Sequence, residues 1–200
     1  MSYALYITHP EVILDPAIPS TRWQLSPQGR ARAEGFARSP ALTPIRLLIA
    51  SAETKTMQTA ELLAAGGSKL VVGKDFHEND RSSTGVVPAA ELEALLDALY
   101  AHPEQSPGGW ESAAASLMRV VRAMTEAVAA HGDQAPLAFI GHGTVGTLLK
   151  CHLAGRPATR SEDQRRMADP GGGNVFAFSL PEFRLLCDWV SMEDFCRIGD

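Results

Sequence analysis

The sequence predicts an α/β protein, a three-layer α/β/α sandwich with a mainly parallel central sheet. Two observations predict this class. Short apolar runs rich in β-branched and aromatic residues alternate with longer helical segments along the whole chain, which is the pattern of strands joined by crossover helices. No internal repeat and no long linker divides the 200 residues. We therefore expect one domain over residues 1–200, a size that supports a single large core.

The first half of the chain predicts three strands and two helices. YALYI (3–7) has the composition of a strand buried on both faces. Ser26 is a suitable N-cap, and Pro27 follows it at the first helical position, so a helix begins there. IRLLIAS (45–51) predicts a second strand, and the helix after it ends at Gly66 and Gly67. KLVVGKDF (69–76) predicts a third strand.

The second half predicts two long helices and three further strands. The helices cover about residues 88–101 and 110–131. PLAFIGHGTVGTLLKCHLAG (136–155) has the order strand, glycine turn, helix. GGGNVFAFSL (171–180) and FRLLCDWVSM (183–192) predict a closing pair of strands. The triple glycine precedes a strand and no helix, so it indicates a bend in the backbone and not a dinucleotide-binding loop.

Composition limits the classes of partner and the cellular compartment. The net charge is −5 and no run of Lys or Arg stands out, which argues against nucleic acid and anionic membrane as partners. The apolar runs are too short to span a bilayer. Three cysteines without metal-type or redox-type spacing fit a reducing compartment. No signal-peptide pattern opens the chain, so we expect a cytoplasmic protein.

Polar side chains follow four of the predicted strands. His9, Ser51 and His142 each come directly after a strand, and His77 with Glu78 follows the third strand. Ligands of open α/β sheets bind beyond the carboxyl ends of the strands, so we expect these residues at one rim. His142 lies between two glycines, and the helix that starts beside it aims free amides at the same place, which suits an anion such as phosphate.

These residue types point to phosphoryl chemistry. A neutral imidazole is available as a nucleophile at neutral pH, and a second imidazole can donate to the phosphoryl oxygens. Lys55, near the start of its helix, offers a cation for an oxyanion. A serine hydrolase is disfavoured because no Gly-x-Ser-x-Gly occurs. A metal site made of the two histidines with His77, Glu78 and Asp80 is disfavoured because no ligand pair has the local spacing of such sites.

At this point the chain resembles the histidine phosphatase superfamily, in its phosphoglycerate mutase-like branch. LYITHPEV (5–12) is similar to the strand that carries the nucleophilic histidine, and LSPQGRARA (25–33) to the helix opening that follows it. IASAETKTMQTAELLA (49–64) is similar to the Ser-Ser-Pro-x-x-Arg-Ala-x-Gln-Thr-Ala segment, and FIGHGTVGTLL (139–149) to the second histidine motif. HENDRSSTG (77–85) occupies the position of the acidic proton donor. The matches keep the family's order along most of the chain.

The resemblance implies a phosphoglycerate mutase-like fold, a phosphomonoester as substrate, inorganic phosphate as product, and neither metal nor cofactor. It implies that His9 takes the phosphoryl group and that His142, Lys55 and Gly143 bind its oxygens. Glu78 would protonate the leaving alcohol and then activate water, for which its pKa must be raised. Asp80 is the alternative acid.

Two positions depart from the family pattern. Thr8 stands where the family has an arginine, and Lys55 stands where it has a second one, although a lysine cannot grip two oxygens as a guanidinium does. Arg81 or Arg22, in the two nearest polar loops, could supply the missing guanidinium. These departures favour reduced catalytic activity over its complete loss. They also leave open a second hypothesis, namely a family member that binds a phosphorylated ligand or partner protein without turnover.

Overall fold

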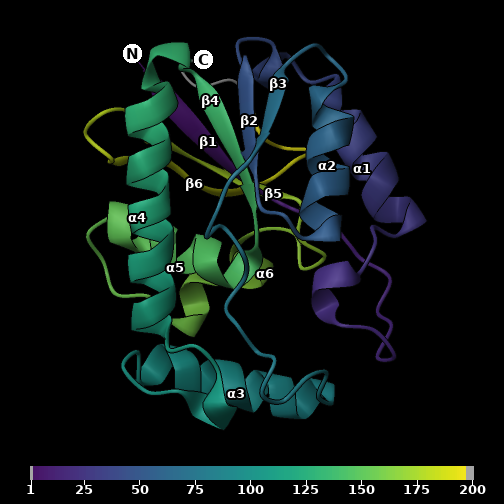
Figure 1. Ribbon diagram of the computed structural model, residues 1–200, viewed down its shortest axis with the longest axis vertical. Coiled ribbons are helices and arrows are strands. Elements are labelled where there is room, and N and C mark those ends of the chain that lie inside the picture. The colour runs from purple at the N-terminus through teal and green to yellow at the C-terminus, as the bar shows by residue number, and fades with distance from the viewer. Residues whose placement is uncertain (1, 197–200) are drawn as a thin grey trace.

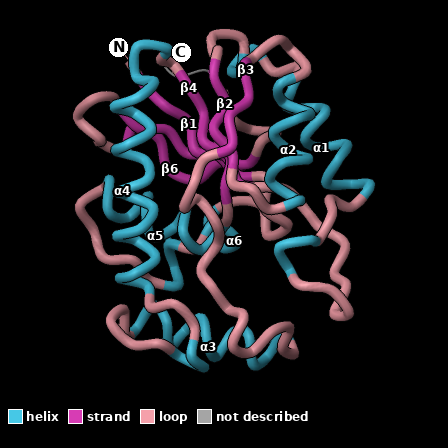
Figure 2. Tube along the Cα trace, in the orientation of Figure 1, coloured by secondary structure: helices cyan, strands magenta, loops and turns pink. Residues whose placement is uncertain are grey.

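Six strands form one sheet in the order β3-β2-β4-β1-β5-β6 in the computed structural model, which describes residues 2–196 (Figures 1 and 2). The strands β1, β2, β3 and β4 run parallel to one another, whereas β5 pairs antiparallel with β1 and β6 pairs antiparallel with β5. The predicted α/β class and the mainly parallel sheet are confirmed. The strands are β1 Tyr3–Thr8, β2 Leu47–Ala50, β3 Lys69–Val72, β4 Leu137–Gly141, β5 Asn174–Ser179 and β6 Leu185–Ser191.

Helices cover both faces of this sheet (Figure 1). Side chains of α1 and α2 pack on one face, and side chains of α4 and α5 pack on the other. One helix, α3, lies at the far end of the molecule, away from the sheet (Figure 1). The helices are α1 Pro27–Ala37, α2 Thr54–Ala64, α3 Ala89–Ala101, α4 Ala113–His131, α5 Gly143–Leu153 and α6 Gln164–Met167. The short α6 was not predicted from the sequence.

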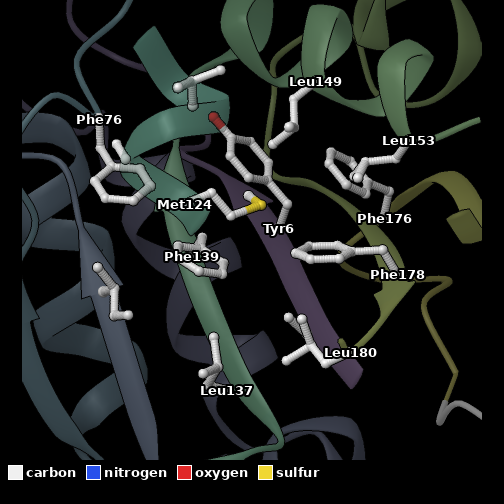
Figure 3. Close-up of a cluster of buried hydrophobic side chains, with 14 of the residues drawn as sticks. Tyr6, Phe76, Met124, Leu137, Phe139, Leu149, Leu153, Phe176, Phe178 and Leu180 are labelled. Atoms are coloured by element: carbon white, nitrogen blue, oxygen red, sulfur yellow. The ribbon is translucent and has the colours of Figure 1, made fainter. Parts of the chain in front are cut away.

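The first strand shows how the sequence generates three layers. Successive side chains of a strand point to opposite faces, and in β1 Tyr6 packs with the core under α4 and α5 while Leu5 and Ile7 pack with the core under α1 and α2. All three are buried. Figure 3 shows the first of these cores, in which the rings of Tyr6, Phe139 and Phe176 lie among aliphatic side chains. A strand that is apolar on both faces therefore fits only in the middle of the sandwich.

Local signals in the sequence set the helix starts. The side chain of Ser26 accepts a hydrogen bond from the Gly29 amide and Pro27 is the first residue of α1, as predicted. The helix α2 ends at Ala64, before the two glycines, and β3 ends at Val72, short of the predicted Phe76. None of the helices in the described part of the chain has the length and apolar character needed to cross a bilayer.

Candidate active site

The carboxyl ends of β1, β2 and β4 meet at one edge of the sheet. The His9 amide donates to the carbonyl of Gly141 (3.1 Å), and the Ser51 amide donates to that of Ile140 (3.0 Å). These bonds carry the sheet pairing one residue past each strand, so the side chains that follow are fixed in place. A cleft of about 820 Å³ opens at this edge, and His9, Lys55, Glu78, Asp80 and Arg81 are among the residues that line it.

His9 is held as a neutral imidazole with one free nitrogen. Its Nδ1 lies 2.9 Å from the carbonyl oxygen of Pro10. A carbonyl only accepts, so Nδ1 carries the proton and Nε2 keeps its lone pair. Burial, His142 and Lys55 lower the pKa of His9 to about 3. At neutral pH the ring is therefore uncharged, with a lone pair on Nε2.

The backbone around His9 is packed against the glycine turn before β5. The Gly173 amide donates to the carbonyl of His9 (3.0 Å), and a Cβ on Gly172 would lie 2.5 Å from that same oxygen. Both glycines have positive φ. The prediction that this glycine run bends the backbone near the rim is confirmed, and its close approach holds the carbonyl side of His9 in place.

His142 lies next to His9, as the sequence predicted for the two strand-end histidines. The ring centroids are 5.5 Å apart with planes at 69°. His142 is fully buried, and the Tyr6 hydroxyl, which contacts both its amide and its carbonyl, fixes its backbone. Its Nε2 lies 3.0 Å from the Ser51 hydroxyl, while its Nδ1 is buried without a hydrogen-bond partner among the described residues. Burial lowers the pKa of His142 to about 4, although Glu53 and Glu78 act to raise it.

Glu53 joins this group, although it was not predicted from the sequence. Its carboxylate accepts from the Lys55 ammonium (2.5 Å) and from the Glu78 amide (3.0 Å), and it lies 3.3 Å from Nε2 of His142. Burial acts to raise the pKa of Glu53, but His142 and Lys55 lower it to about 2. Lys55 also donates to the Ser20 carbonyl (2.8 Å). The lysine thus reaches the cleft, but as half of an ion pair.

Glu78 occupies the place where the sequence analysis put an anionic ligand. Its carboxylate accepts from the amides of Thr144 (3.0 Å) and Val145 (3.1 Å) at the start of α5, and from the Asn79 amide (2.8 Å). The expected rise in its pKa is wrong. Burial acts to raise the pKa of Glu78, but the Arg81 guanidinium, His142 and the bonding amides lower it overall. Helix amides favour the ionised carboxylate, so this group is charged in the free protein.

The other predicted residues lie at different distances from the two rings. Arg81 lines the cleft, where its guanidinium lies over the Trp110 ring and donates to the Thr144 hydroxyl (2.5 Å). Asp80 also lines the cleft, but it is exposed and its carboxylate accepts from the Ser82 amide. Arg22 is exposed and is not among the residues that line the cleft. The structure therefore brings Arg81, and not Arg22, to the site.

Two small residues complete the edge. Thr8 is buried, and its hydroxyl donates to the Gln164 side chain (2.7 Å) and accepts from the Asn174 amide (2.9 Å). The Thr8 side chain is thus hydrogen-bonded within a polar network behind the sheet edge. Gly143 begins α5, and a Cβ there would lie 2.4 Å from the amide nitrogen of Gln164. The contacted atom is Nε2 of the Gln164 side chain, so a larger residue at 143 would push this side chain away from Thr8 and Asn174.

The buried neutral histidines predict how the free energy of unfolding changes with pH. In an unfolded chain a histidine titrates near pH 6.5, about 2.5 pH units above His142 in the fold. The unfolded chain therefore binds more protons than the folded one between these values, so stability is present above about pH 6.5 and is lost as the pH falls. We expect denaturant titrations at pH 7 and pH 4.5 to show that His142 lowers the free energy of unfolding by about 2–3 kcal/mol at the lower pH. In His142→Asn, measured at pH 7 and pH 4.5, the free energy of unfolding should fall less between the two pH values, because the contribution of His142 is absent. If it falls as much as in the wild type, His142 is not the residue responsible.

Comparison with known proteins relates this geometry to a family. The family model described as "Histidine phosphatase superfamily (branch 1)" matches residues 18–186, a match that begins after His9. No curated protein matches the chain. The family model covers most of the sequence, including Lys55, Glu78 and His142.

Solved structures show the same fold at low sequence identity. A mycobacterial glucosyl-3-phosphoglycerate phosphatase with inorganic phosphate is 18% identical with a TM-score of 0.76, over 98% of this chain and 100% of that one. The alpha-ribazole phosphatase from Shigella flexneri is 17% identical with a TM-score of 0.69, over 94% and 95% of the two chains. YhfR from Bacillus stearothermophilus is 14% identical with a TM-score of 0.72, also over 94% and 95%. At these identities the likeness establishes the fold alone.

Proposed function

The chain belongs to the histidine phosphatase superfamily, and we propose that it is a metal-independent phosphomonoesterase that works through a phosphohistidine intermediate. One observation carries the proposal. The free Nε2 of His9 lies in a cleft beside the ring of His142, so a phosphorus atom held between the two rings is within reach of a neutral nucleophile. The substrate would be a phosphorylated small molecule or protein, and inorganic phosphate the product.

The reaction has two steps. In the first, Nε2 of His9 forms a bond to phosphorus as the bond to the ester oxygen breaks, and the leaving alcohol takes a proton from Glu78. In the second, Glu78 removes a proton from water, whose oxygen attacks phosphorus and releases His9 and phosphate. A bound phosphoryl dianion raises the pKa of a neighbouring carboxyl group, because like charges disfavour its ionisation. Glu78 can therefore take the proton of an ester that enters as the monoanion, so this step needs no further proton from solvent.

The test is turnover of 4-nitrophenyl phosphate by the wild-type protein in the presence of a chelator, followed by trapping of the phosphorylated protein at alkaline pH. Mass spectrometry should locate the phosphoryl group on His9. Turnover that depends on an added metal, or a phosphoryl group on another residue, would contradict the proposal.

A protein that binds phosphate without turnover is the second candidate. Two observations favour it, because Glu53 already neutralises Lys55 and the Thr8 hydroxyl is bonded within the protein. Such a protein would be stabilised against heating by phosphate and would release no nitrophenol in the same assay.

The cleft walls predict the kind of ester that is hydrolysed fastest. The cations that line the cleft among the described residues are Lys55 and Arg81, and both already have partners. A second anionic group on the substrate would find no free cation, whereas an apolar group would find apolar neighbours, among them Val12, Ile18, Pro19, Val86, Val87 and Leu92. We expect kcat/KM for 1-naphthyl phosphate to exceed that for 3-phosphoglycerate by about tenfold or more.

Val86→Asp should reduce this preference, because Val86 lines the cleft and is 47% exposed. The matched control is Met118→Asp, at an exposed apolar residue of α4 that does not line the cleft. Equal rates for the two esters in the wild type would show that the apolar walls do not select the substrate.

A further inference from the structure

Glu53 is a buried carboxylate that the proposed mechanism does not use. It is 8% exposed and lines the cleft. Its two oxygens contact three groups of the site: the Lys55 ammonium, the Glu78 amide and Nε2 of His142. A buried charge is costly unless it is paired, so the position of this one needs a reason.

The charges around the two imidazoles do not suit a dianion as they stand. Glu53 neutralises Lys55, and Glu78 is a second carboxylate at the start of α5. Arg81 is the second cation of the cleft, and the exposed Asp80 also lines it, so three carboxylates face two cations while both rings are neutral. A phosphoryl dianion that entered this site would bring two uncompensated negative charges.

His142 contains the group that can supply the missing charge. Nε2 lies 3.0 Å from the Ser51 hydroxyl, which can donate or accept, and 3.3 Å from the Glu53 carboxylate, which only accepts, so Glu53 favours the tautomer with the proton on Nε2. Nδ1 then has a lone pair, and it is buried without a hydrogen-bond partner in the described chain. A neutral ring in this tautomer cannot donate to a phosphoryl oxygen from Nδ1, but an imidazolium can.

We propose, on the basis of the function above, that a phosphoryl group binds together with one proton, which His142 takes up on Nδ1, and that Glu53 is the positioning residue for this uptake. The proton comes from solvent. In the complex Nδ1–H donates to a phosphoryl oxygen while Nε2–H faces the Glu53 carboxylate. The imidazolium is thus held between two anions, and His9 stays neutral as the nucleophile.

The groups that face His142 fit this arrangement. His9 comes from the end of β1, Glu53 and Lys55 from the start of α2, and His77 and Glu78 from the loop after β3. Burial keeps His142 neutral in the free protein, since its pKa is lowered to about 4. A bound dianion adds a further negative charge beside the ring and stabilises the charged form.

Sulfate is the probe, because it is a dianion that carries no proton at the pH values used. Its affinity for the wild-type protein should fall as the pH rises from 6 to 8, by up to about tenfold for each pH unit, the limiting slope for uptake of one proton. Histidine nitrogen NMR should show both nitrogens of His142 protonated in the complex at pH 7, with His77→Gln used to assign the neighbouring ring. An affinity that does not change with pH, or a complex in which His142 keeps one proton, would overturn the proposal. If Glu78 takes up the proton instead, the sulfate affinity would still fall with rising pH, but the NMR spectrum would show only one protonated nitrogen in His142.

Glu53→Gln separates the proposal from the simpler view that Glu53 only neutralises Lys55. We expect the variant to bind sulfate at pH 6 at least about tenfold more weakly, because a charge-assisted contact to the imidazolium is lost. Glu53→Asp should recover part of the affinity. Tighter binding by Glu53→Gln would mean that freeing Lys55 dominates, and would overturn the proposal.

The matched control is Glu162→Gln, which removes the half-buried carboxylate of another Glu–Lys pair, with the buried Lys150, outside the cleft. It should leave the pH slope unchanged. If Glu53→Gln fails to fold, the NMR measurement on the wild-type protein still shows whether His142 takes up the proton. Turnover of 4-nitrophenyl phosphate tests the proposed function separately, so the proton linkage can fail while the phosphatase stands.

Discussion

Replacement of His9 by glutamine should reduce phosphatase turnover by about 10⁴-fold or more, because the covalent route closes when its nucleophile is removed. In both His9 and His77, which line the cleft, Nδ1 lies 2.9 Å from a backbone carbonyl, and His9 is the one whose ring lies beside that of His142. The amide group of glutamine has no comparable lone pair on nitrogen. The measurement is kcat/KM for 4-nitrophenyl phosphate, together with the yield of trapped phosphorylated protein.

The control for this prediction is His152→Gln, at an exposed histidine in the last turn of α5. It should retain the wild-type rate. His9→Gln should still be stabilised against heating by phosphate, because Lys55 and His142 remain. Substantial turnover by His9→Gln would rule out His9 as the acceptor of the phosphoryl group.

The meeting of His9 and His142 could be predicted because it follows from backbone rules. Each residue comes directly after an apolar strand, and parallel strands bring their carboxyl ends to one edge. The start of α1 could be predicted for the same kind of reason, since Ser26 and Pro27 are local signals that act within one helical turn.

The electrostatics of the site could not be predicted because they depend on contacts between distant segments. The Glu78 carboxylate is ionised through amides 66 and 67 residues further along the chain. In the sequence, Glu53 looks like an ordinary acidic residue before a helix, and only the fold places it against His142. Likewise, loop composition suggested both Arg81 and Arg22, and only the path of each loop shows which one reaches the cleft.

The ionised state of Glu78 leads to the second large effect, a change in which step limits turnover. The two oxygens of Glu78 accept three backbone N–H bonds, and a carboxylate has about four lone-pair sites, so one site stays available. An ionised carboxylate with a free lone pair is ready to act as the base that activates water. The free protein is therefore prepared for the second step, the hydrolysis of phosphohistidine, more than for the first.

Glu78→Gln should for this reason accumulate the phosphorylated protein. With 4-nitrophenyl phosphate, whose leaving group needs little protonation, we expect a burst of about one nitrophenol per protein molecule, followed by turnover about 10²–10⁴-fold slower than in the wild type. Asp80→Asn, at the alternative acid, should give steady turnover without a burst. A stopped-flow trace of nitrophenol release distinguishes the two variants.

Loss of the carboxylate also removes a partner of the amides that begin α5, which should cost roughly 1–2 kcal/mol of stability. Rates should therefore be compared below the unfolding temperature of each variant. A burst depends on the phosphorylation step alone, so a folded Glu78→Gln protein that shows no burst and no accumulation would exclude Glu78 as the base for the second step. If Asp80→Asn shows the burst instead, the catalytic carboxylate is Asp80, and Glu78 serves only to hold the start of α5 next to His142.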